Sequence, residues 1–364
     1  MNVMGSTHMA SDDIDSLNTT AETNRSAVIK QWSLYLIKRL GILLIVLISV
    51  SILTFSVTRF AGTPLYAAVG VYSTDEMIAE RKEKMGLNKP LWEQYATYLS
   101  GLARGNLGSS RRTFAPVRDE IADRLPATAE LVIFAVGLSI LWAVPVGALA
   151  AFRPKGWADR IGSSLGQIGV SVPSFWLGLL FIYLLYYVLA LLPAPFGRLG
   201  GADPPDSVTG FYTVDALLAG DLALFGEAVR YLLMPALTLS FTSSPPIFSV
   251  TRSAVSTVLG SQFVEAARSY GIPSRALKFR HVAPNAAPPV INIVAMTFGY
   301  LIGGAVLVEV VFSWPGIGTY AVQAMDFSDY DPVLGVVLLS ATIYVVVYFL
   351  ADLIQFLLDP RLRE

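Results

Sequence analysis

Six long stretches without Asp, Glu, Lys, Arg or His dominate the hydrophobic pattern of this chain. Each is 19 to 32 residues long. A bilayer core of roughly 30 Å needs about 20 helical residues, so each stretch is long enough to span it. Six of them in succession are improbable as buried helices of a soluble core. The sequence therefore predicts an all-α membrane protein with six transmembrane helices, over Leu40–Thr58, Leu131–Phe152, Ile161–Leu192, Tyr231–Thr251, Ala286–Val308 and Pro332–Ala351.

Composition supports this prediction and removes several classes of function. The 364 residues are 54% hydrophobic and only 15% charged, whereas a soluble domain carries about 25% charged residues. A net charge of −1 lacks the basic surplus of a nucleic-acid-binding protein. The absence of cysteine excludes disulfides, thiolate metal sites and cysteine catalysis. With only His8 and His281 as histidines, we expect no metal site and no catalytic site on this chain.

Between these stretches, the chain divides into regions of different composition. Residues 1–30 are expected to be a disordered cytoplasmic tail, and 31–58 an interfacial helix leading into the first span. Residues 59–130 are expected to form a small extracytoplasmic helical domain. It would hold one helix over Ser73–Met85, a second from Pro90, and a short third from Pro116 to Leu125-Pro126. Residues 131–358 would carry the other five spans, with a cytoplasmic loop at 257–285, and 359–364 a cytoplasmic C-terminus.

Lys and Arg in the short loops predict the orientation. With a cytoplasmic N-terminus, the short outer loops hold only Arg198 and Arg230, while the outer segment Arg59–Glu130 is long enough to be translocated whatever its charge. The inner loops then hold eight basic residues: Arg153, Lys155, Arg160, Arg252, Arg268, Arg275, Lys278 and Arg280. Both termini are therefore predicted to be cytoplasmic.

Charged residues beside the spans are few. Glu130, Glu309 and Asp352 each lie at the edge of an uncharged stretch, with no Lys, Arg or His inside a span to pair with them. These positions favour interfacial or helix-capping roles over the ion relay that a secondary transporter would need.

The inner loop before the fifth span has a distinctive pattern. We expect a helix over Ser261–Tyr270, ended by Gly271 in the left-handed position. Pro273 then suits the first turn of a second helix, which would stop at Pro284. The small residues Ala266 and Ala267 would let another surface approach the backbone. A merely basic inner loop would explain the Lys and Arg residues but not this spacing.

The spacing of Glu265-Ala266-Ala267, Gly271 and Pro284-Asn285 resembles the coupling loop of binding-protein-dependent ABC importers. Six further motifs are Gly86-Leu-Asn-Lys-Pro-Leu-Trp-Glu-Gln-Tyr95, Gly105-Asn-Leu-Gly-Ser109, Arg124-Leu-Pro-Ala-Thr128, Ser171-Val-Pro-Ser-Phe-Trp176, Glu309-Val-Val-Phe-Ser-Trp-Pro-Gly-Ile-Gly318 and Leu358-Asp-Pro-Arg361. They resemble the dipeptide, oligopeptide and nickel permeases, and the large outer domain resembles the first of the two permease subunits in that family. Pro245-Pro246 in the fourth span departs from the family pattern.

The resemblance implies a pore-forming permease subunit of an ATP-driven importer in a bacterial or archaeal inner membrane. Implied partners are a second homologous permease, two ATPase subunits and an extracytoplasmic solute-binding protein. ATP and Mg²⁺ would bind the ATPases, since this chain has no phosphate-binding loop. Peptides are the expected solute by family frequency, with nickel, opines or sugars, and less favoured a secondary transporter, as alternatives. The implied ATPase-coupling residues are Glu265, Ala266, Ala267, Gly271, Pro273, His281, Pro284 and Asn285.

Overall fold

The computed structural model describes residues 37–57, 83 and 88–358, which form helices and connecting segments without a β-strand. The predictions for residues 1–30, the Ser73–Met85 helix and residues 359–364 lie outside the described residues. The described helices, two of them π-helical (η1 and η2), are Ile37–Val57, α4 (Leu91–Ala103), α5 (Val117–Phe152), α6 (Trp157–Ser171), α7 (Ser174–Phe181), η1 (Ile182–Val188), α8 (Tyr212–Leu218), α9 (Leu222–Leu259), α10 (Gln262–Ser269), α11 (Ser274–Ala276), η2 (Leu277–Val282), α12 (Ala283–Gly304), α13 (Val306–Val311), α14 (Ile317–Asp326) and α15 (Tyr330–Leu358).

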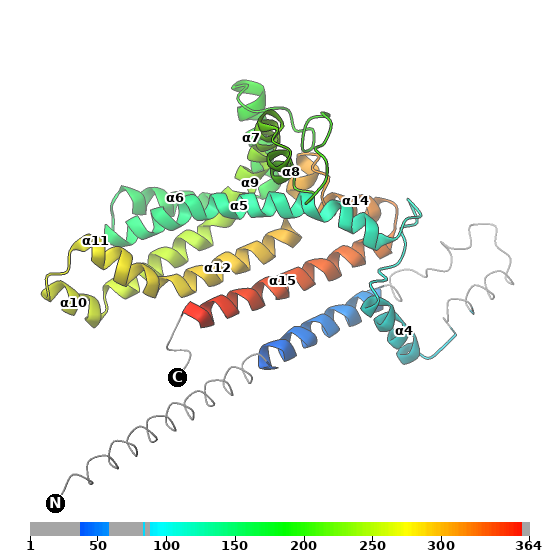
Figure 1. Cartoon of the computed structure of the whole chain (residues 1–364), viewed down its shortest axis with the longest axis horizontal. Helices are drawn as coiled ribbons and strands as arrows, with labels where there is room; N and C mark the ends of the chain where they lie inside the picture. The colour runs from blue at the N-terminus through cyan, green and yellow to red at the C-terminus, as the bar shows by residue number, and fades with distance from the viewer. Residues whose placement is uncertain (1–36, 58–82, 84–87, 359–364) are drawn as a thin grey trace, which may run out of the picture.

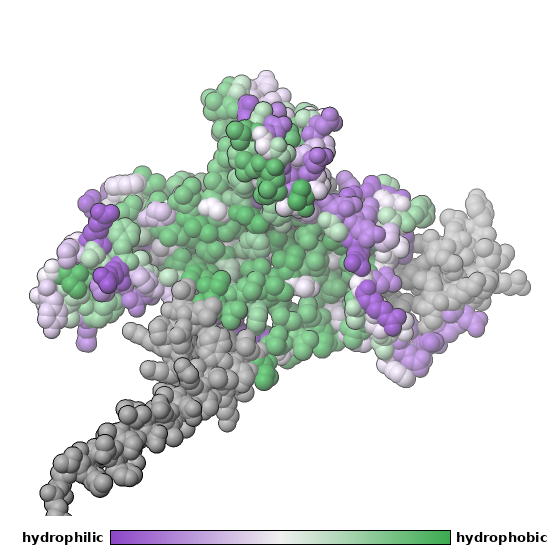
Figure 2. Space-filling view, in the orientation of Figure 1, coloured by the Kyte–Doolittle hydropathy of each residue, from purple (hydrophilic) through white to green (hydrophobic). Residues whose placement is uncertain are grey.

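Five of these elements are long and apolar enough to cross a bilayer: the Ile37–Val57 helix, α5, α9, the continuous stretch from α11 to α12, and α15. They lie side by side along the length of the molecule (Figure 1). Hydrophobic side chains cover the middle of the visible face, and polar ones gather at its two ends (Figure 2). The chain is therefore a multi-pass membrane protein, with a sixth span only if the bent pair α6 and α7–η1 counts as one.

The third uncharged stretch is not the single straight span that its length predicts. Its two halves meet at an angle of 109°. Pro173 causes the break, because it lacks a backbone N–H and forces the preceding Val172 into extended geometry, with φ −97° and ψ 124°. As a result, α7 projects sideways from the bundle (Figure 1).

Other prolines do not interrupt their helices. The predicted helix end near Leu125-Pro126 is wrong, because α5 continues through Pro126, and the boundary proposed at residue 130 falls within it. Similarly, α9 continues through Pro245-Pro246. Pro245 leaves the Phe241 carbonyl without its helical donor, and the Ser244 hydroxyl donates to that carbonyl instead, at 3.2 Å.

The main core lies where α5, α9, α12 and the α13–α14 turn meet. Leu131, Leu239, Leu301 and Trp314 are among its fully buried members. The core therefore joins α5 and α9, the two longest described helices, to the turn after α13.

Helix α4 begins directly after Pro90, as predicted, and packs against the Ile37–Val57 helix. The Tyr95 hydroxyl lies 2.8 Å from Ser51 Oγ, and the Tyr98 hydroxyl 2.9 Å from Thr54 Oγ1. Helix α4 is thus joined to the Ile37–Val57 helix through two tyrosines.

Candidate functional site

The loop between α9 and α12 begins with α10, whose end has a complete hydrogen-bonded cap. The Gly271 N–H donates to the Arg268 carbonyl at 2.9 Å, and the Ile272 N–H to the Ala267 carbonyl at 3.2 Å. Gly271 has φ +75°, the left-handed conformation that glycine adopts without strain. The predicted helix end at Gly271 is therefore confirmed.

One face of α10 packs against the bundle and the other faces outward. Val264 and Ala267 are buried in a cluster with residues at the end of α9 and the start of α12. Glu265, Ala266 and Tyr270 are exposed. Of the two small residues expected to meet a partner, only Ala266 is available, because Ala267 is part of the internal packing.

The second half of the loop is helical throughout, so the predicted stop at Pro284 is wrong. The chain passes from α11 through η2 into α12 without a break. Pro284 is the second residue of α12 and lies inside this continuous helical run. The Asn285 side-chain amide donates to the His281 carbonyl at 2.7 Å and bridges the joint between the two helices.

A groove of about 680 Å³ lies beside α10, along α11 and η2. Pro273, Arg275, Phe279 and Arg280 line it, and the Phe279 ring is 73% exposed. The Lys278 ammonium lies 4.5 Å from the centre of the Phe152 ring and joins this segment to α5. Together, α10 and this groove form an exposed surface of basic and aromatic residues at one end of the bundle.

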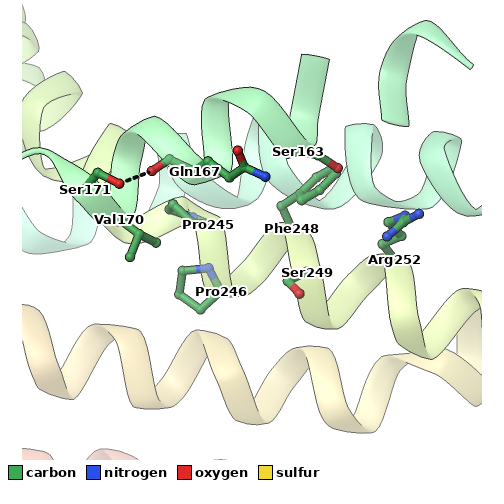
Figure 3. A pocket seen from close by; sticks show the side chains of 10 residues that line it. Ser163, Gln167, Val170, Ser171, Pro245, Pro246, Phe248, Ser249 and Arg252 are labelled. Carbon is green, nitrogen blue, oxygen red and sulfur yellow. Dashed lines mark hydrogen bonds between the residues drawn. The ribbon is translucent and has the colours of Figure 1, made fainter. Parts of the chain in front are cut away.

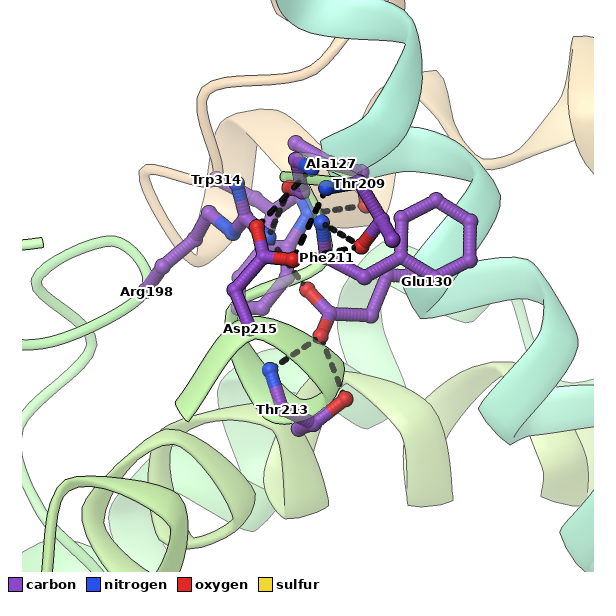
Figure 4. A network of polar contacts seen from close by, with 9 residues as sticks. Ala127, Glu130, Arg198, Thr209, Phe211, Thr213, Asp215 and Trp314 are labelled. Atoms are coloured by element: carbon purple, nitrogen blue, oxygen red, sulfur yellow. Dashed lines mark hydrogen bonds and ion pairs between the residues drawn. The ribbon is translucent and has the colours of Figure 1, made fainter. Parts of the chain in front are cut away.

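Away from this surface, a buried ion pair attaches the segment between η1 and α8 to helix α5 (Figure 4). The Arg198 guanidinium donates to the Glu130 carboxylate and, at 2.8 Å, to the Gly210 carbonyl. The same carboxylate accepts from the N–H and the hydroxyl of Thr213, at 2.8 and 2.7 Å. The Arg198 guanidinium also stacks 3.4 Å from the centre of the Tyr212 ring.

Asp215 stabilises the turn next to this ion pair. Its carboxylate accepts from the N–H and hydroxyl of Thr209, both at 2.8 Å, and from the Gly210 N–H at 2.9 Å. Burial opposes ionisation, but these donors outweigh it and hold the pKa of Asp215 below its ordinary value. Gly210 fits there because a Cβ would lie 2.8 Å from the Pro126 ring.

Glu309 caps α14 from outside that helix, consistent with the capping role that its edge position predicts. Its carboxylate accepts from the Thr319 N–H at 2.9 Å and from the Thr128 hydroxyl at 2.6 Å. Thr128 Oγ1 in turn accepts from the Ile317 N–H at 2.9 Å. These contacts satisfy donors at the N-terminus of α14 and place a negative charge at the positive end of its dipole. A Cβ on Gly316 would lie 2.3 Å from Thr128 Oγ1, so only glycine fits.

These contacts bring together two of the sequence motifs that lie far apart in the chain. The Trp314 indole N–H donates to the Ala127 carbonyl at 2.8 Å, beside the Glu309–Thr128 contact. Sequence reasoning noted Glu130 and Glu309 only as edge residues and did not assign the roles of Thr128 or Arg198. The motifs that contain Thr128 and Glu309 were visible in the sequence, but nothing in the sequence indicates that these two motifs contact each other.

Comparison with known proteins agrees with this architecture. Residues 143–364 match the family described as the binding-protein-dependent transport system inner membrane component, and residues 33–132 match its N-terminal counterpart. The dipeptide transport system permease protein of Alkalihalophilus pseudofirmus is 36% identical, covering 90% of this chain and 99% of that protein. The probable D,D-dipeptide transport system permease protein of Escherichia coli K12 is also 36% identical, covering 91% and 97%.

A third relative is the dipeptide transport system permease protein of Escherichia coli K12, 33% identical over 91% of this chain and 98% of its own length. Both family models and the full-length similarity lead to the same assignment. The chain belongs to the family of inner membrane components of binding-protein-dependent transport systems.

Proposed function

We propose that this chain is the pore-forming permease subunit of an ATP-driven importer of di- or oligopeptides, and that α10 couples it to ATPase subunits. The solute is inferred from the three relatives, whose names specify dipeptide transport. Nickel, opine or sugar transport is the alternative within the same class of importer. Hydrolysis of ATP is assigned to separate ATPase subunits.

The observation that carries the coupling proposal is the division of α10 into two faces. Val264 and Ala267 anchor it to the ends of α9 and α12, while Glu265 and Ala266 face outward. A force applied to the exposed face would therefore reach two spans through packed side chains. Reversing a 1:99 preference between two conformations takes about 5.5 kcal/mol of differential binding. Closure of the ATPases against α10 would supply it.

The remaining partners and the topology follow from this role. A second homologous permease would complete the pore, and an extracytoplasmic binding protein would deliver the solute. The surface of α10, α11 and η2 is basic, and basic residues favour the cytoplasmic side of a membrane. This supports an orientation in a bacterial or archaeal inner membrane with that surface and both termini on the cytoplasmic side. Pro273, His281, Pro284 and Asn285 shape the loop and are assigned to coupling with Gly271.

The test reverses the charge of Glu265. In proteoliposomes holding the assembled transporter, Glu265→Lys should leave the amount of inserted permease unchanged but abolish peptide uptake and solute-stimulated ATP hydrolysis. The double variant with Gly271→Pro, which cannot adopt φ +75°, should abolish both as well. The matched control is Glu227→Lys, the same charge reversal at an exposed glutamate of α9. Unchanged uptake in Glu265→Lys would contradict the coupling assignment, and uptake without ATP would favour a secondary transporter.

A further inference from the structure

A groove of about 750 Å³ lies between α6 and α9. Figure 3 shows the side chains that line it, with α6 on one wall and α9 on the other. Its polar members are Ser163, Gln167, Ser171, Ser249 and Arg252. All but Arg252 come from the third and fourth uncharged stretches of the sequence.

The lining of this groove mixes apolar side chains such as Val170 and Pro246 with exposed polar ones. The exposed Ser171 hydroxyl donates to the Gln167 carbonyl at 2.8 Å, whereas no hydrogen bond joins the exposed side chains of Gln167 and Ser249 to the described residues. Hydrocarbon offers such groups no partner, which makes their exposure to it costly. By contrast, a second groove of about 440 Å³ between α5, α12 and α15 has an almost wholly hydrocarbon lining, including Ile140 and Phe298. The groove between α6 and α9 is therefore the more polar of the two and the one that offers hydrogen-bonding groups to water or a polar solute.

Close packing of α6 on α9 maintains the groove. A Cβ on Gly162 would lie 2.3 Å from the Phe248 ring, and one on Gly169 would lie 2.8 Å from the Phe241 carbonyl oxygen. Glycines at these positions bring the helices into contact behind the polar side chains. Pro245 packs against Gly169 as well, so the two walls are held at a defined separation.

Among the lining residues, Arg252 is the only charged one. It lies on the part of α9 that leads into α10, and its Nε is 2.8 Å from Asp159 Oδ1, while its Nη2 is 3.2 Å from Oδ2. The Asp159 side chain is 10% exposed but that of Arg252 is 44% exposed. Only Nη2 donates a hydrogen bond to Asp159, through Oδ2, while Oδ1 accepts none, which leaves other N–H groups of the guanidinium free to bind an acceptor in the groove.

We propose that the groove between α6 and α9 is this chain's wall of the solute pathway, and that Arg252 contacts the carboxylate of a passing peptide. The pathway assignment rests on the proposed permease function, and the role of Arg252 rests also on the peptide solute. Neutral amide and hydroxyl groups followed by a partly paired cation match a peptide, which carries amide groups and a terminal carboxylate.

Thiol labelling tests the pathway assignment without reference to the solute, because this chain has no cysteine of its own. Gln167→Cys and Ser249→Cys are placed in the complete transporter in proteoliposomes and exposed to a charged, membrane-impermeant methanethiosulfonate. Leu141→Cys is the control, since Leu141 is 72% exposed on α5 within apolar surroundings. The groove cysteines should react at least about tenfold faster than Leu141→Cys, because only a hydrated thiol ionises. Adding nucleotide to the transporter should change the labelling rates of the groove cysteines.

Two results would overturn the pathway assignment. Labelling of the groove cysteines no faster than Leu141→Cys would mean that lipid covers the groove. Protection in every nucleotide state, with crosslinking to the second permease, would mean that the groove is a closed subunit interface. Both measurements remain valid if the transporter carries no peptide, so they separate this proposal from the proposed solute.

The role of Arg252 is tested by comparing uptake of a dipeptide with uptake of its C-terminal amide. Arg252→Gln should raise KM for the dipeptide about three- to tenfold and leave that of the amide unchanged, whereas Arg252→Lys should retain part of the preference. Asp159→Asn removes the ion pair but keeps Arg252, and should preserve the discrimination. Equal loss in Asp159→Asn, or an unchanged ratio in Arg252→Gln, would refute the contact.

Discussion

The buried pair of Glu130 and Arg198 gives a prediction whose size follows from the structure. Their side chains are 3% and 7% exposed, so neither charge is compensated by water. Glu130→Ala removes the carboxylate, leaves the Arg198 guanidinium buried beside α5, and deprives the Thr213 N–H of its acceptor. The segment between η1 and α8 should then detach from the bundle.

The magnitude comes from two contributions that overlap. Breaking a buried ion pair by removing one partner costs about 3–5 kcal/mol. An orphaned N–H such as that of Thr213 costs about 1–3 kcal/mol, part of which relaxation recovers. We therefore expect Glu130→Ala to lower the free energy of unfolding by about 4 kcal/mol, close to a thousandfold change in the equilibrium constant. Glu130→Leu combined with Arg198→Leu should cost less, because it leaves no buried charge.

The assay is reversible unfolding of the purified permease in mixed micelles, by titration with dodecyl sulfate and tryptophan fluorescence. Asp123→Ala is the control, because Asp123 is an exposed acid on the same helix and its loss should change stability by no more than about 0.5 kcal/mol. If Glu130→Ala unfolds at the same detergent fraction as Asp123→Ala, the pair is not an anchor. If the double leucine variant is as damaged as the single alanine, the uncompensated charge of Arg198 is not the cause.

Three further outcomes are expected. Gly316→Ala should destabilise the α13–α14 turn by about 1–3 kcal/mol through overpacking, measured in the same titration, while Gly303→Ala, with nothing within 4 Å of its Cβ, should not. Gly271→Ala should cost about 1–2 kcal/mol for its left-handed backbone and Gly260→Ala, at φ −84°, should cost little, as amide exchange across α10 would report. The lowered pKa of Asp215 means that its contribution is complete above its ordinary value of 3.8 and is lost as pH falls through the lower, folded-state value. Pepsin should therefore cleave the turn at Thr209–Gly210 of the wild type faster as pH falls toward 2. In Asp215→Asn, the same turn should be accessible to pepsin at every pH. Equal pH dependence of cleavage in the two proteins would contradict this account.

Much of the fold follows from local chemistry and was predictable. A span excludes charge whatever its neighbours are, and therefore stretches such as Leu131–Phe152 can be recognised as membrane spans from the sequence alone. The end of α10 at Gly271 was equally predictable, because a left-handed residue is a local requirement. Both features depend on the chain near the residue and not on what packs against it.

Proline effects required the tertiary structure. Pro173 bends its helix pair by 109°, whereas Pro126 and Pro245 lie inside continuous helices. In α9, the Ser244 hydroxyl, next to Pro245 in the sequence, satisfies the freed carbonyl of Phe241. The sequence alone contains the prolines but does not show which of them bends its helix.

The sequence by itself determined that this protein is a helical membrane protein and where α10 ends, because hydropathy and helix-ending residues act over a few turns. The tertiary structure decided which residues meet: Glu309 with Thr128, Glu130 with Arg198, and the polar rows of α6 and α9 across one groove. Such pairings join positions up to 181 apart in sequence. They depend on the packing of whole helices, which no local pattern specifies.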